Sequence, residues 1–167
     1  GTITSSLAFT STTSGISGDN TITFATLSAG TYTPTVTITD ASGNASTVTL
    51  TSFVIDTAAP TLSEQTVVSS PSNDTTPSYI FTTDEAGTIT TSISQNFSTS
   101  LSASTGSDQT ITFNTLPEGT YSGETITVTD TAGNAGSITI PDFVIDTTAP
   151  VITSTETGTN LDENSGS

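Results

Sequence analysis

Apolar and polar positions alternate along much of the chain, and this alternation is typical of β-strands with one buried face. The clearest examples are residues 35–39 and 125–129, in which Val or Ile alternates with Thr. Because successive side chains of a strand point to opposite faces, the alternation predicts which apolar side chains point inward. They are Val36, Ile38, Ile126 and Val128. No segment shows the 3.6-residue period of a helix, so the pattern predicts an all-β protein.

Turn-forming residues (Gly, Pro, Asn, Asp and Ser) interrupt this pattern about every ten residues, which favours a β-sandwich. In the second half of the chain the pattern predicts seven short strands, near residues 62–68, 78–83, 87–94, 97–103, 109–114, 120–129 and 137–145. Seven strands in a domain of this size predict an antiparallel sandwich of the immunoglobulin-like type. Tyr32 and Tyr121 come near the start of the sixth strand, where that fold has its tyrosine corner.

The chain repeats its own sequence. Residues 1–4 recur at 87–90 and residues 53–60 recur, with one change, at 143–150, which are offsets of 86 and 90 residues. Three further segments recur in the same order: 21–24 as 110–113, 30–32 as 119–121, and 40–44, with two changes, as 130–134. Because order and spacing are kept, each repeat is interpreted as one small β domain.

The repeat divides the chain into three parts. Residues 61–150 form a complete immunoglobulin-like repeat, called unit 2. Residues 1–60, called unit 1, have no counterpart of residues 61–86 and therefore lack the first two strands. Residues 151–167 begin a third repeat. Two explanations of unit 1 stay open: the sequence is cut from a longer chain, or another copy supplies the missing strands.

Four motifs in unit 2 carry a family resemblance: Val-Thr-Asp-Thr-Ala-Gly-Asn (128–134), Thr-Pro-Ser-Tyr-Ile-Phe (76–81), Asp-Glu-Ala-Gly-Thr-Ile (84–89) and Val-Ile-Asp-Thr-Thr-Ala-Pro (144–150). They resemble the bacterial Ig-like repeats of giant cell-surface adhesins of the RTX type. The tail at 159–166 is similar to the opening of bacterial cadherin-like repeats. The resemblance implies tandem β-sandwiches in an extracellular stalk, on the bacterial cell surface or secreted, often with calcium at the joints.

The charge of the chain excludes several kinds of partner and chemistry. The sequence has 16 acidic residues and no Lys, Arg or His, so its net charge is −16, and it also lacks Cys. Nothing in it can neutralise phosphate, so we expect neither nucleic acid nor an anionic membrane surface as a partner. Zinc, haem and iron–sulfur sites and a catalytic Ser-His-Asp or Cys-His group are excluded too. Oxygen ligands remain, and these suit calcium.

Strand alternation predicts where the acidic loops gather. With seven alternating strands, the linker before unit 2 and the turns at 84–87 and 130–134 all lie at one pole of the domain. The residues brought there are Asp56, Asp84, Glu85, Asp130 and Asn134. Neighbouring carboxylates repel one another unless a cation binds, so we expect one calcium ion between the units. Asp146 with Glu163 or Asp162 would begin a second such site.

A simpler interpretation of the same residues stays open. Asp-x-x-Gly-Asn is a good hairpin turn by itself, in which the Asp side chain accepts hydrogen bonds from nearby amides. Asp56 could likewise be a solvated residue at a strand end. The prediction of a metal site depends on the strand count, because one miscounted strand would separate the loops.

The sequence therefore predicts a structural extender: stalk repeats of a large extracellular bacterial adhesin, stiffened by calcium, whose partners are neighbouring repeats. The alternative is a self-associating subunit of a filament or matrix, in which copies complete one another by strand complementation. We do not expect an enzyme, because Asp84 and Glu85 are adjacent in a tight turn without an aromatic cleft for a sugar. A carbohydrate-binding module is disfavoured too, since the chain has no Trp.

Overall fold

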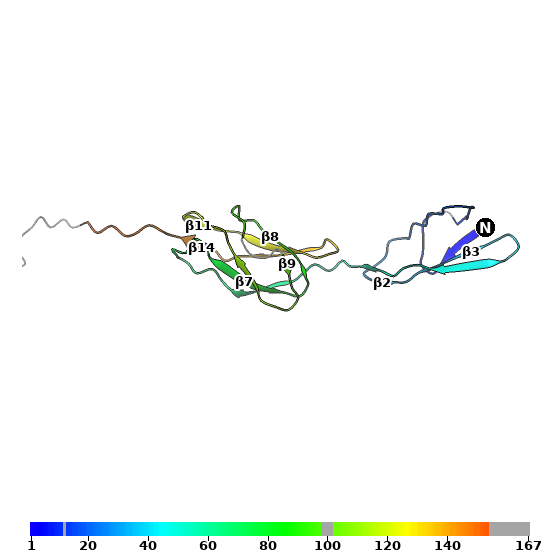
Figure 1. The fold of residues 1–167 in the computed structure, drawn as a ribbon, viewed down its shortest axis with the longest axis horizontal. Coiled ribbons are helices and arrows are strands. Elements are labelled where there is room, and N and C mark those ends of the chain that lie inside the picture. Colours follow the sequence, from blue (N-terminus) through cyan, green and yellow to red (C-terminus); the bar gives the residue numbers. More distant parts are fainter. Residues whose placement is uncertain (12, 98–101, 154–167) are drawn as a thin grey trace, which may run out of the picture.

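The computed structural model describes residues 1–11, 13–97 and 102–153. All regular elements in this part are β-strands, so the prediction of an all-β fold is confirmed. The described part contains no helix that is long and apolar enough to cross a membrane. Figure 1 shows the two units one after the other along the long axis, joined by an extended linker.

In the part of unit 2 that the structure describes, nine strands pair antiparallel in three sheets. One sheet has the order β10-β7-β6, the second has the order β13-β12-β8-β9, and β11 pairs with β14. The strands are β6 (Leu62–Thr66), β7 (Ser78–Thr83), β8 (Gly87–Thr91), β9 (Ser102–Ala103), β10 (Gln109–Thr112), β11 (Gly119–Tyr121), β12 (Thr125–Thr129), β13 (Ala135–Thr139) and β14 (Phe143–Ile145).

The core of unit 2 lies between these sheets. Val128 of β12 pairs with Ile89 of β8, and Ile111 of β10 pairs with Tyr79 of β7. These side chains and that of Phe81 are almost completely buried and belong to one hydrophobic cluster. The alternation of Val and Ile with Thr thus predicted the inward positions of β12 correctly.

Two predicted strands of unit 2 are each divided in two. The predicted strand 120–129 is broken at Ser122–Glu124, where Gly123 has a φ of 70°. The chain thereby leaves β14, the partner of β11, and joins β8 and β13 in another sheet. The predicted strand 137–145 ends at Thr139 and resumes at Phe143, because Pro141 has no amide to donate to a ladder. Of the predicted strand 97–103, residues 98–101 lie outside the described part.

Both tyrosines occupy the predicted corner. The Tyr121 hydroxyl donates to the carbonyl of Pro117 at 2.9 Å, and the Tyr32 hydroxyl donates to the carbonyl of Ser28 at 2.8 Å. Each bond reaches back four residues, as a tyrosine corner requires. The ring of Tyr121 also stacks on that of Phe143, with centroids 4.8 Å apart. These bonds fix the segment that leads into β11 and β2.

The segment that follows β6 and the last strand of unit 2 lie side by side in parallel. Ser72 forms a parallel bridge with Ile145 of β14. The Ser72 amide donates to the carbonyl of Val144 at 3.0 Å, and the Asp146 amide donates to the carbonyl of Ser72 at 2.9 Å. The amide of Val144 also donates to the Ser70 hydroxyl. Unit 2 is therefore closed near the pole from which the chain leaves.

Unit 1 contains only part of this sandwich. Its strands are β1 (Thr2–Ser5), β2 (Gly30–Tyr32), β3 (Thr35–Thr39), β4 (Ala45–Thr49) and β5 (Phe53–Ile55). The sheet β1-β3-β4 corresponds to β8-β12-β13, and the pair β2-β5 corresponds to β11-β14. Within the described residues, unit 1 has no counterpart of β6 and β7. Its buried side chains there are those of Ile3, Pro34, Val36 and, at the junction, Pro60.

One prediction of an inward side chain is wrong. Ile38 was expected to point into a core, but 39% of its surface is exposed, whereas its counterpart Val128 is fully buried. Ile38 has the register that the alternation predicts and pairs with Ile3 and Ser46. Within the described residues, no second sheet covers Ile38, so its side chain stays exposed. Strand period alone predicts which way a side chain points, not whether anything packs against it.

Candidate metal site at the junction between the units

The linker after β5 is held against one pole of unit 2 at both of its ends. The Asn134 amide group donates to the carbonyl of Asp56 at 3.2 Å. The backbone amide of Thr61 donates to the Asp84 carboxylate at 2.7 Å. The side chains of Asp84 and Asn134 both lie in turns of unit 2. These turns therefore position the linker at this pole of the folded domain.

Between these two points the linker backbone passes directly over β13. A Cβ atom on Gly136 would lie 1.7 Å from the carbonyl oxygen of Pro60, which no side chain permits. The counterpart of Gly136 in unit 1 is Ser46. Glycine is therefore required at the junction because the linker approaches the strand so closely.

Three carboxylates converge beside the docked linker. Asp56, Glu85 and Asp130 each place one carboxylate oxygen so that the three atoms lie within 4.8 Å of one another. Asp56 comes from the linker, Glu85 from the turn between β7 and β8, and Asp130 from the turn between β12 and β13. Glu85 and Asp130 are half-buried and Asp56 is exposed. The chain has no Lys, Arg or His, so no basic side chain can compensate these charges.

The three carboxyl groups do not share one electrostatic environment. Loss of hydration raises the pKa of Glu85, and the charges of Asp56 and Asp130 raise that pKa further. Asp130 behaves oppositely: hydrogen bonds from Asn134 lower its pKa despite partial burial. Of the three clustered carboxyl groups, Glu85 is thus the one whose ionised form is most destabilised in the folded protein.

The other predicted ligands are not among the three clustered carboxylates, although Asn134 contacts two residues of the cluster. The Asp84 carboxylate accepts from the Thr61 amide, which lowers its pKa. The Asn134 side chain donates to Asp130 and to the linker carbonyl. Asp146 directly follows β14 (Phe143–Ile145), and its carboxylate accepts from the Thr148 amide at 3.0 Å. Asp162, Glu163 and the tail at 159–166, which is predicted to open a cadherin-like repeat, lie outside the described residues.

The hairpin-turn role of the acidic motif is present in both units. Asp130 accepts from the Asn134 backbone amide at 2.8 Å and from its side chain at 2.9 Å. Asp40 accepts from the same two groups of Asn44, both at 2.9 Å. The turn therefore explains the motif itself. It does not explain why Asp56 and Glu85 join Asp130, and carboxylate oxygens keep lone pairs for a further partner.

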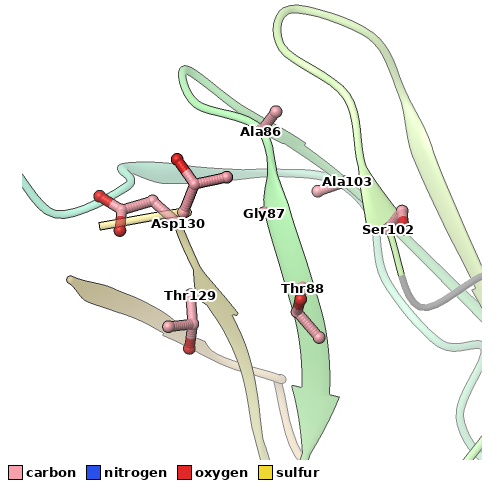
Figure 2. A pocket seen from close by; sticks show the side chains of 8 residues that line it. Ala86, Gly87, Thr88, Ser102, Ala103, Thr129 and Asp130 are labelled. Carbon is pink, nitrogen blue, oxygen red and sulfur yellow. The ribbon is translucent and has the colours of Figure 1, made fainter. Parts of the chain in front are cut away.

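A hollow lies at the ends of β8, β9 and β12 and is lined in part by Asp130 (Figure 2). Its floor is formed by Gly87 and Ala103, and Thr88, Ser102 and Thr129 contribute hydroxyl groups. Figure 2 shows the Asp130 carboxylate pointing away from this floor. The hollow thus offers small apolar groups and hydroxyls, and Asp130 is the member of the carboxylate cluster that lines it.

Sequence reasoning missed a second acidic residue that positions a linker. Glu118 accepts from the amide and hydroxyl of Thr147, at 3.1 and 2.7 Å, and from the Thr148 hydroxyl. These bonds lower the pKa of Glu118. In unit 1 the counterparts of Glu118 and Thr148 are Ala29 and Ala58. This paired difference between the units is the sequence signal that could have revealed the role of Glu118. It shows that the two linkers are held in different ways.

Comparison with known proteins agrees with the repeat. The sequence profile of the bacterial Ig-like domain matches the chain twice, over residues 2–57 and 64–147. No curated protein matches it. The matches cover most of the chain and fall on the two units that share strand order, tyrosine corner and acidic turn. The chain therefore belongs to the bacterial Ig-like domain family.

Proposed function

We propose that the two units are extender repeats of a large extracellular bacterial adhesin, on the cell surface or secreted, and that calcium stiffens the joint between them. Membership of the Ig-like family supports a repeated structural module. The linkers enter and leave unit 2 at opposite poles, so each added unit lengthens the chain (Figure 1). The observation that carries the calcium proposal is the convergence of linker and domain carboxylates without a basic counter-charge.

Calcium suits these residues better than other cations do. All available ligands are oxygens, and calcium accepts six to eight oxygens in flexible geometry. Asp56, Glu85 and Asp130 would hold the ion, with water completing the coordination. Because Asp56 belongs to the linker and the other two belong to unit 2, an ion bound to all three would restrict the linker.

The expected energy is modest for one joint. Extracellular calcium modules typically bind with a Kd of about 10⁻⁴–10⁻³ M. At a free concentration ten times the Kd, binding stabilises the folded state by about 1.4 kcal/mol. The larger consequence is mechanical, since a restricted linker at every joint turns a string of domains into a semi-rigid rod.

The first test separates the turn from the metal site. Asp130→Asn should abolish the heat of calcium binding in isothermal titration calorimetry, because it removes one of three clustered carboxylates. Asp40→Asn is the matched control. It changes the equivalent position of the equivalent turn in unit 1, where Asn44 is the partner as Asn134 is in unit 2. We expect the control to bind calcium like the unchanged protein.

Two outcomes would contradict the proposal. No heat from the unchanged protein at millimolar calcium would remove the site altogether. Equal loss of binding in Asp130→Asn and Asp40→Asn would mean that the variants act through their turns. Magnesium titrated in parallel checks that the heat is specific, since its stricter octahedral geometry disfavours such a loop-built site.

A second prediction concerns Glu85, whose substitution should change stability in opposite directions with and without calcium. In a chelator, Glu85→Gln should raise the melting temperature, because it removes repulsion by Asp56 and Asp130. In excess calcium it should lower the melting temperature, because it removes a ligand. Glu64→Gln, outside the cluster, is the control and should show no such reversal.

The stabilisation in chelator should also depend on pH. The raised pKa of Glu85 means that its charged form destabilises the folded state above that pKa. As pH falls through the raised pKa, Glu85 binds a proton and the repulsion disappears. The advantage of Glu85→Gln should therefore be full at pH 7 and vanish near the ordinary glutamate pKa of about 4.3. An advantage that stays constant over this range would exclude repulsion as its cause.

A further inference from the structure

The loop before β11 carries an acidic side chain that reaches the linker leaving unit 2, residues 146–150. Gly119 of β11 pairs with Ile145 of β14, so Glu118 comes one position before that ladder begins. The hydroxyl of Tyr121 donates to the carbonyl of Pro117, which fixes the backbone next to Glu118. The tyrosine corner therefore holds this carboxylate beside the exit linker.

The Glu118 carboxylate accepts hydrogen bonds from two successive linker residues. Its Oε2 atom accepts from the backbone amide of Thr147 at 3.1 Å and from the Thr147 hydroxyl at 2.7 Å. The Thr148 hydroxyl lies 2.9 Å from Oε2 and 3.0 Å from Oε1. Hydrogen bonds to an ionised acceptor are roughly twice as strong as neutral ones. We call this arrangement of Glu118, Thr147 and Thr148 the Glu118 clamp.

Two further bonds complete the attachment of the exit linker. The Asp146 amide donates to the carbonyl of Ser72, and the Thr148 amide donates to the Asp146 carboxylate. With the amide of Thr147 held by the clamp, three successive backbone amides have acceptors in unit 2 or in the linker itself. Residues 146–150 are all exposed, so hydrogen bonds and not burial order this segment.

The linker that leaves unit 1 has the same aspartate turn but no clamp. The Ala58 amide donates to the Asp56 carboxylate at 3.0 Å. Ala29 takes the place of Glu118, and neither Ala29 nor Ala58 has a side-chain oxygen that could form the clamp bonds. The first linker is instead held by the turns of unit 2, the domain that follows it.

We propose that the Glu118 clamp fixes the direction of the exit linker by hydrogen bonds alone, without a metal ion. The chain then contains two kinds of linker. The first is positioned by the domain after it, and the second is positioned by the domain before it. The proposal does not depend on calcium at the first linker, because no residue of the clamp belongs to the carboxylate cluster.

Amide NMR relaxation of the full 167-residue chain in a chelator tests the proposal. An order parameter of about 0.85 marks a rigid amide, and one below about 0.6 marks a flexible amide. The amides of Thr147 and Thr148 should be near the first value in the unchanged protein and below the second in Glu118→Ala. Asp108→Asn is the control for the lost charge, since Asp108 is an exposed acid in another loop of unit 2. It should leave both amides ordered.

Substitutions of Thr148 separate the clamp from a general effect on the fold. Thr148→Ala introduces the residue of unit 1 and should lower both order parameters in part. Thr148→Ser keeps the hydroxyl and should preserve them. Unit 2 should keep its melting temperature in every variant, because the clamp lies outside the core cluster.

Each other outcome would overturn the proposal. Amides that stay ordered in Glu118→Ala would show that the clamp is not needed. Equal loss of order in Asp108→Asn would make net charge the cause, and a lowered melting temperature in Glu118→Ala would make it the fold of unit 2. Order that appears only after calcium is added would mean that an ion, with Asp146 as a ligand, holds the exit linker.

Discussion

Phe113→Ala is expected to lower the free energy of unfolding of unit 2 by about 3–5 kcal/mol, the usual loss for a fully buried phenylalanine. Its side chain has no exposed surface and lies in the core cluster with Tyr79 and Phe81. Phe24→Ala, the same substitution in the same sequence of unit 1, should cost only about 1–2 kcal/mol. Phe24 is half-buried and keeps one described ring partner, Phe53, at 6.2 Å.

Urea denaturation of the full chain, followed by amide NMR signals of each unit, measures both changes. In Phe113→Ala, unit 2 should unfold at a clearly lower urea concentration. In Phe24→Ala, the urea midpoint of unit 1 should change little. Equal losses in the two units would mean that the face of unit 1 is covered in solution. The comparison is well controlled, because the neighbouring residues Thr-Ile-Thr precede both phenylalanines.

Gly136→Ala is expected to destabilise unit 2 by about 1–3 kcal/mol, the range for forced overpacking. The new methyl group would lie 1.7 Å from the Pro60 carbonyl, so the linker must move away from β13. That movement would also weaken the bond from Asn134 to Asp56 and separate Asp56 from the other carboxylates. Calcium affinity should therefore fall together with stability.

Ser46→Ala is the matched control for this substitution and should change stability by less than about 0.5 kcal/mol, as exposed positions usually do. Thermal unfolding gives the stability change, and NMR relaxation of residues 57–60 reports the freedom of the linker. Unchanged linker dynamics in Gly136→Ala would contradict the close approach of the Pro60 backbone. A loss of stability without a loss of calcium binding would mean that the position of the linker does not determine calcium binding.

Much of the fold could be predicted because its signals are local. The alternation in residues 125–129 directly reports the two faces of β12. Turn residues then gave nearly correct strand limits, with β7 matching its prediction fully. The gathering of Asp56, Glu85 and Asp130 followed from strand direction alone, since alternating strands bring alternate turns to the same pole.

The rest depended on three-dimensional context. Whether Ile38 is buried depends on a second sheet that strand period does not reveal. The exchange of sheets after β11 depends on the positive φ of Gly123, and many glycines in this chain could provide one. Asp84 and Glu85 are adjacent carboxylates, yet one accepts a hydrogen bond from the Thr61 amide and the other faces the cluster. Only the twist of the turn decides between them.

The parallel contact between Ser72 and Ile145 has a consequence for a chain under tension. Both segments run toward the pole where the chain leaves, so pulling the two linkers apart drags the segments past each other. The two bonds that join Ser72 to Val144 and Asp146 are then strained together, in shear, instead of opening one after the other. We therefore expect the segment at Ser72 and β14 to resist force together before the core is exposed.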